Sequence, residues 1–321
     1  MAGSLLTAAV LVRVLAGRRD EFQTALTDVA VWVLIATVLL QIVALVSRSE
    51  AWHRTIEAAG GTVDRRTLYR ASSMQVVGGV LNGHLGVAAR IAALRRSSPD
   101  VCPQVPTLIA AEFPILTIEA MLAALTSFTL VAPLGLPWWL PIVAFVVVAA
   151  ISTGLRQLAR REGRKLWSGL AVLRSLDGGS RVFGFVLIAV FAQILRNWLL
   201  LHAVGVDASF FDAIAVLIAV VTLGQLPVGP TVGAAAAVLI LGSDGVAAAA
   251  AAGVLLTVTG TVGGFCFAAW AGADRLWVSR GAGRRLWPLS RRRGRAQLSP
   301  PSAPGALRPG PSPTRTQPER G

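Results

Sequence analysis

Long apolar runs, separated by short segments that carry most of the charge, make up most of this chain. A helix needs about 20 apolar residues to cross a bilayer, and five runs approach or exceed that length. Residues 1–28 contain a shorter apolar stretch, which we expect to form an interfacial helix or the end of a span. The predicted spanning helices cover residues 29–47, 106–131, 138–155, 182–204 and 246–272. The pattern predicts an all-α, polytopic helical membrane protein.

Two further apolar stretches are broken in the middle. Residues 71–94 contain several glycines and residues 212–242 contain a proline and glycine segment, so each half is too short to span alone. Irregular backbone at membrane depth is tolerated only where it is buried in protein or lines a wet cavity. We therefore predict two re-entrant-like helical hairpins, with helix breaks at Gly79, Gly83, Gly86, Pro227, Gly229 and Pro230.

The basic residues orient these segments, because cytoplasmic connections of membrane proteins carry an excess of Lys and Arg. Of the 30 Lys and Arg residues, 26 lie in four segments, residues 48–70, 90–105, 156–181 and 273–321. Three other connections contain no Lys or Arg and are predicted to lie outside, residues 132–137, 205–211 and 243–245.

This orientation makes the first hairpin start and end inside and the second start and end outside. Each hairpin stands between two spans, so the two triplets run in opposite directions and predict an inverted repeat. Interrupted segments at matching positions of inverted halves are typical of transporters with a midplane site. The alternative, given equal weight, is that Gly and Pro are simply frequent in membrane helices.

Composition favours a membrane protein over a soluble one. The 321 residues are 54% hydrophobic and 14% charged, and the mean hydropathy is +0.65. A net charge of +14 would suggest nucleic-acid binding in a soluble protein, but here the charge lies in the predicted loops and indicates topology. We expect the cytoplasmic (cell) membrane as the location, a transmembrane domain over residues 29–272, a basic, Pro-rich, disordered cytoplasmic tail over residues 273–321, and no nucleic-acid partner.

Few ionisable residues lie inside the predicted spans, and such residues are functional candidates because charge is costly in lipid. Glu112 and Glu119 share one face of the second span, Arg196 lies in the fourth, and Arg90 lies on the returning arm of the first hairpin. Counting about 1.5 Å per residue predicts two pairs at matched depths, Glu119 with Arg196 and Arg90 with Glu112. The pairs either lock helices together or leave arginines free to coordinate a lipid phosphate.

Two other residues near the breaks have simpler explanations beside the functional ones. His84 is a candidate for titration near neutral pH or for contact with a headgroup, although a structural histidine is the commoner case. Pro114 is predicted to kink its helix close to Glu112.

Enzyme signatures are missing from the sequence. It contains no HExxH, GxSxG or Walker motif, and no cytoplasmic segment is long enough for a catalytic domain. We therefore expect a protein that is not an enzyme, with no metal site and no cofactor.

Short motifs occur at both predicted breaks. Residues 82–90 read NGHLGVAAR, residues 203–206 read AVGV and residues 226–230 read LPVGP. These motifs resemble the transmembrane region of lysylphosphatidylglycerol synthases and their stand-alone flippase-like relatives. Gly86 and Arg90 match the family pattern Pro-x-Arg-x-Gly-Glu-x-x-Arg, whose proline, first arginine and glutamate are absent here.

Glu112 resembles the acidic residue that the family has in the following helix, whereas the acidic position of the second half reads alanine here. The resemblance implies translocation of a phospholipid or a polyprenyl-linked substrate between leaflets, with membrane lipids as partners. On that hypothesis Arg90, Glu112, Glu119 and Arg196 form or close the polar path. The alternative is a non-catalytic membrane scaffold, or an accessory subunit whose partner is a lipid- or glycan-modifying enzyme.

Overall fold

The computed structural model describes residues 17–79, 83–99, 101–160, 165–223, 232–241 and 245–283. The described residues form helices and no strand, which confirms the all-α prediction. The chain divides into one unit from Met1 to Trp277 and a second from Val278 to Gly321.

Five helical segments are long and apolar enough to cross a membrane, so the chain is a multi-pass membrane protein. Each corresponds to one predicted span. They are α3 (Val31–Ala58), the run Val105–Leu134, α9 (Leu140–Arg160), α10 (Leu176–Ala203) and α13 (Val246–Gly283).

Several of these helices extend beyond the predicted boundaries. The region 48–70 was expected to be a loop, but α3 continues to Ala58 and α4 begins at Arg65. The extension is buried on nearly all sides within the protein, and seven of the residues 49–56, including Trp52 and Ile56, are buried. Counting apolar runs finds the part of a helix that faces lipid and misses a polar extension that packs on protein. In the same way α13 runs to Gly283, into the predicted tail, and residues 284–321 lie outside the described part.

The second span is divided near Glu112. Helix α6 (Val105–Ala110) ends there and α7 (Phe113–Thr126) begins, with Pro114 in its first turn. The helix is thus interrupted beside Pro114, where a kink was predicted, and proline is tolerated in a first turn because an N–H there would have no partner within the helix. The span then ends in a short 3-10 helix, η1 (Ser127–Leu130), and α8 (Val131–Leu134).

Both predicted broken stretches are pairs of short helices. The first pair is α4 (Arg65–Gly79) with α5 (Gly83–Ser97), and the second is α11 (Phe210–Leu223) with α12 (Val232–Leu241). A Cβ at Gly86 would lie 2.7 Å from the carbonyl oxygen of Gln75 and 3.2 Å from the Cα of Gly79. Only glycine allows the two backbones of the first hairpin to approach this closely.

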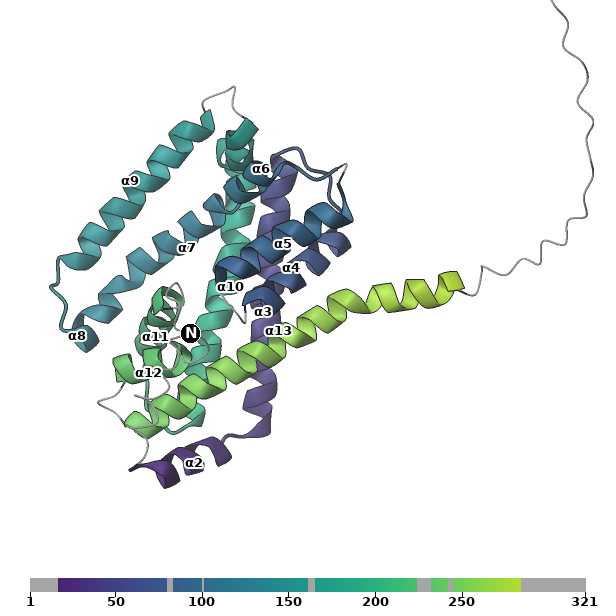
Figure 1. The fold of residues 1–321 in the computed structure, drawn as a ribbon. Coiled ribbons are helices and arrows are strands. Elements are labelled where there is room, and N and C mark those ends of the chain that lie inside the picture. The colour runs from purple at the N-terminus through teal and green to yellow at the C-terminus, as the bar shows by residue number, and fades with distance from the viewer. Residues whose placement is uncertain are drawn as a thin grey trace, which may run out of the picture. The chain divides into compact units, whose positions relative to one another are not determined.

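The two hairpins pack at opposite ends of the bundle (Figure 1). We name one end the basic end, where the 3-10 helix η2 (Lys165–Arg174) contacts α3, α6, α9 and α10. The opposite end is formed by η1, α8, α11 and α12, which contact one another. Hairpin α4–α5 packs at the basic end and hairpin α11–α12 at the opposite end, as the inverted repeat predicts.

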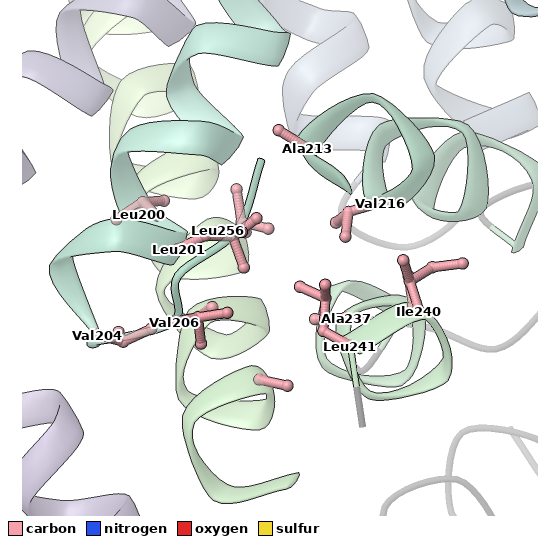
Figure 2. Close-up of a cluster of buried hydrophobic side chains, with 14 of the residues drawn as sticks. Leu200, Leu201, Val204, Val206, Ala213, Val216, Ala237, Ile240, Leu241 and Leu256 are labelled. Carbon is pink, nitrogen blue, oxygen red and sulfur yellow. The ribbon is translucent and has the colours of Figure 1, made fainter. Parts of the chain in front are cut away.

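Two separate clusters of buried side chains hold these ends together. The basic-end core joins α3, α4, α5, α6, η2 and α10 around Trp52, Leu94 and Val186. The opposite-end core joins α10 to α11, α12 and α13, with Leu200 and Leu201 opposite Val216 and Ile240 (Figure 2). Helix α10 crosses between the cores and packs along α3.

Candidate functional site

A cavity of about 500 Å³ lies between the two cores. Its walls come from α3, α4, α5, α7, α10, α11 and α13, so both hairpins contribute to it. Ligand sites in proteins commonly have volumes of about 300–1,000 Å³. The volume and the many contributing helices make this cavity the candidate functional site.

The cavity wall is mostly apolar, and most of its polar side chains come from one group of helices. Helices α3, α4, α5 and α7 provide most of the polar lining, which is Gln41, Arg48, Ser49, Ser72, Gln75, Arg90, Glu119 and Thr126, while α10 and α11 add Gln193 and Thr222. Helices α10 and α11 provide a largely apolar lining, which includes Leu187, Val190, Phe191, Ile194, Ile214, Leu217, Ile218 and Val221. An amphipathic molecule therefore matches the wall better than a fully polar or fully apolar one.

Helix periodicity explains the polar side. Gln41, Ala44, Leu45 and Arg48 follow one another at helical spacing and line the cavity from one face of α3. In α5, Gly86, Arg90 and Leu94 are spaced four residues apart and are all buried. Gly86 brings α5 against α4, which carries Arg90 into the wall of the cavity.

Arg48 forms an ion pair with Glu119 across the cavity wall. The distance from Arg48 Nη1 to Glu119 Oε1 is 2.8 Å, and both side chains are partly exposed. Arg48 Nε is buried and has no partner. Arg48 thus lines the cavity with an ion-paired guanidinium whose Nε has no partner within the protein.

Arg90 is almost completely buried, with 1% of its surface exposed. It forms an ion pair with Glu112, as predicted from their matched depths, and its guanidinium carbon lies 3.9 Å from the centroid of the Trp52 ring. The ring face is electron-rich and stabilises the cation. A buried ion pair is costly to break because the remaining charge stays desolvated.

The predicted pair of Glu119 with Arg196 is wrong. Glu119 pairs with Arg48, and Arg196 donates a hydrogen bond to the side-chain oxygen of Gln41. Rise per residue gives the depth of a side chain but not the direction in which it points. Arg196 points from α10 toward α3 and α13, where its Nη1 would lie 3.3 Å from a Cβ at Gly260.

Glycines on α13 make room for this polar contact. A Cβ at Gly263 would lie 2.8 Å from the Cβ of Gln41, and a Cβ at Gly264 would lie 2.4 Å from the Cγ1 of Val76. Small residues allow membrane helices to pack closely in this way. Helix α13 therefore fixes both Gln41 and the α4 side of the cavity.

Other predicted site residues are placed only in part. His84 lies in the first turn of α5, but its side chain is outside the described residues. Gly79 and Gly83 stand at the facing ends of α4 and α5, as expected for a break between them. Pro227, Gly229 and Pro230 lie outside the described residues. Among the residues that are described, no group of His, Cys, Asp or Glu could hold a metal ion.

Sequence reasoning missed Arg48, Gln41 and Ser72 as wall residues. Arg48 was counted as a loop charge because it follows the predicted span directly. The signal was present, because Gln41 and Arg48 are seven residues apart and so share a face of one otherwise apolar helix. No protein-family model matches the chain, and no curated protein matches it as a relative.

Proposed function

We propose that this chain translocates a lipid between the leaflets of the cytoplasmic membrane, in the manner of a flippase. The amphipathic cavity between the two hairpins carries the proposal. A lipid combines a polar headgroup with apolar chains, and the wall offers a partner to each.

The exposed part of the apolar wall supports a lateral route for the lipid. Leu187, Phe191 and Val221 line the cavity, yet 43%, 54% and 54% of their surfaces are exposed. Side chains of this kind on a spanning helix face the hydrocarbon chains of the bilayer. A lipid can therefore bring its headgroup to the polar wall while its chains stay in the membrane.

The basic end is proposed to face the cytoplasm, which puts the C-terminus on the cytoplasmic side. Arg54, Arg160 and Arg174 lie at this end, as the positive-inside rule requires. Hairpin α4–α5 then lies toward the cytoplasm and hairpin α11–α12 toward the outside. A site between two opposed hairpins is suited to alternating access from the two sides.

Reconstitution into liposomes tests the proposal. Fluorescent phospholipids with several headgroups, and polyprenyl phosphates, would be followed by quenching from the outside. We expect faster loss of inner-leaflet fluorescence with the protein than in protein-free liposomes, and a lower rate with Arg48→Gln. The control is Arg156→Gln, which removes an exposed arginine of α9 outside the cavity. No protein-dependent movement of any of these lipids would remove the proposal.

The buried pairing of Arg90 with Glu112 favours a second candidate, a membrane scaffold or accessory subunit for a lipid- or glycan-modifying enzyme. In a scaffold, both residues only hold helices together. The two candidates differ at Arg48 and Glu119, which face the cavity. A scaffold keeps its cellular function when both are replaced by glutamine, whereas a translocator loses it.

A further inference from the structure

Three buried donor groups in the cavity wall have no hydrogen-bond partner. They are Arg48 Nε, Ser72 Oγ and Arg90 Nε, and all three residues line the same cavity. Buried polar groups in folded proteins are nearly always paired, so each unpaired group calls for an explanation. A guanidinium can only donate hydrogen bonds and a hydroxyl can donate one. The molecule that satisfies this wall is therefore rich in acceptor oxygens.

The charges around the cavity leave a positive excess. Arg48, Arg90 and Glu119 line it, Glu112 is paired with Arg90, and Arg196 is bonded to the lining residue Gln41. Three arginines, Arg48, Arg90 and Arg196, thus stand against Glu112 and Glu119. The excess charge belongs to Arg196, which lies behind the lining residue Gln41 and has this neutral side chain as its partner. In a medium of low dielectric constant an unbalanced charge is strongly unfavourable. One negative charge in the cavity would restore the balance.

The geometry of Arg48 matches a phosphate group in particular. Its Nη1 lies 2.8 Å from Glu119 Oε1 and its Nε is buried without a partner, so a ligand in the cavity meets Arg48 through the exposed third of its side chain. A guanidinium edge presents two parallel N–H donors, which fit two oxygens of a phosphate or carboxylate. The apolar wall of α10 and α11 continues from this site, so the anion belongs to a molecule with long apolar chains.

We propose that the cavity selects lipids whose headgroup carries one net negative charge on a phosphodiester, and that Arg48 is the residue that binds this charged phosphate. The lipid as occupant rests on the proposed function. Glu119 competes with the headgroup for Arg48, so the ion pair opens when the phosphate binds. A cationic, aminoacylated headgroup is disfavoured, because the described lining residues include two arginines and one carboxylate, Glu119, and so leave an excess of positive charge.

Lipid binding to the full chain in detergent micelles tests the selection directly. Native mass spectrometry would measure the bound fraction for phosphatidylglycerol and phosphatidylcholine with identical acyl chains. We expect phosphatidylglycerol to bind at least about tenfold more tightly. Arg48→Gln should remove most of this preference by weakening phosphatidylglycerol alone, and Arg48→Lys, which keeps the charge but loses the planar fork, should weaken it less.

Glu119→Gln is expected to change the affinity for phosphatidylglycerol in the opposite direction. Removal of the competing carboxylate should strengthen binding of phosphatidylglycerol several-fold and leave phosphatidylcholine unchanged. Arg156→Gln is the matched control and should alter neither lipid. Glu119→Gln also keeps the test decisive if Arg48→Gln does not fold. A weaker affinity of Glu119→Gln for phosphatidylglycerol would contradict the proposal.

Other outcomes separate this inference from the proposed function. Equal binding of the two lipids, tighter binding of lysylphosphatidylglycerol, or displacement of phosphatidylglycerol by millimolar inorganic phosphate would overturn the selection of an anionic lipid. Selective binding without translocation in liposomes would overturn the function and keep the selection. Translocation without any headgroup preference would overturn the selection and keep the function.

Discussion

The two ends of this bundle are built from different chemistry. The basic-end core is surrounded by buried polar and charged groups, among them Glu50, His53, Ser72, Arg90 and Glu112. The opposite-end core consists of apolar side chains, many of them alanines of α11, α12 and α13. Most of the buried charge thus lies in the half that provides the polar wall of the cavity. The other half is closed mainly by apolar packing, with Arg196 and Asn197 of α10 buried close to it in the chain.

The two hairpins accordingly contribute different residues to the cavity. Hairpin α4–α5 brings a charged residue to the cavity, and its backbones touch through glycine. Hairpin α11–α12 contributes an apolar wall through α11. In the proposed function, the first hairpin holds a headgroup and the second is the barrier that a headgroup must pass.

The largest effect is expected from removal of one member of the buried ion pair. Glu112→Ala leaves Arg90 buried without its partner and should cost about 3–5 kcal/mol of unfolding free energy. Unfolding in mixed detergent micelles with increasing dodecyl sulfate would measure it. The double variant Arg90→Met with Glu112→Leu should recover most of the loss, because no unpaired charge remains. If Glu112→Ala lowers the free energy of unfolding by less than about 1 kcal/mol, the basic end does not depend on its buried ion pair and the contrast with the opposite end is lost.

Apolar packing, by contrast, should contribute equally at both ends. Leu94 in the basic-end core and Leu201 in the opposite-end core are both completely buried. We expect Leu→Ala to lower the free energy of unfolding by about 2–3 kcal/mol at either position. This is the lower end of the range for buried leucines, because lipid is itself apolar and adds little hydrophobic driving force to packing. The same micelle titration gives both values. A clearly larger cost at Leu201 would mean that the opposite end depends more on packing.

The close approach within the first hairpin gives a smaller effect. Gly86→Ala places a methyl group 2.7 Å from the Gln75 carbonyl oxygen and should cost about 1–3 kcal/mol, as overpacking does. Gly79→Ala is the matched control, because a Cβ there has no atom within 4 Å. Thermal unfolding in detergent would compare the two. Equal melting temperatures for both variants would show that the hairpin separates easily.

The smallest effect concerns Cys102, which lies between α5 and α6 at the basic end. Burial raises the pKa of its thiol above the usual value, although Arg95 opposes the shift. Less thiolate is therefore present at neutral pH, and labelling by a maleimide should be a few times slower than for a free cysteine and should speed up as pH rises. With Cys266 replaced by alanine, an impermeant maleimide should label inverted vesicles and not intact cells. Labelling of intact cells would reverse the proposed orientation.

The elements of the fold were largely predictable, and the contacts between them only in part. Apolar run lengths predicted five spans, and glycine and proline predicted two hairpins, because both depend on local composition. The Arg90–Glu112 pair followed from depth, and Glu112, in the turn between α6 and α7, does point to Arg90 of α5. Depth alone failed for Arg196, whose helix turns that side chain toward Gln41 rather than toward α7.

The sequence by itself determined that this chain crosses a membrane several times, which segments cross, and where its charge lies relative to them. These properties follow from hydrophobicity and from the rise of a helix, which act along one dimension. Only the tertiary structure decided that Arg48 meets Glu119, that α13 makes room for Gln41, and that the polar face of α3 lines a cavity. Such contacts depend on the rotation of each helix about its own axis, which is fixed by packing against its neighbours.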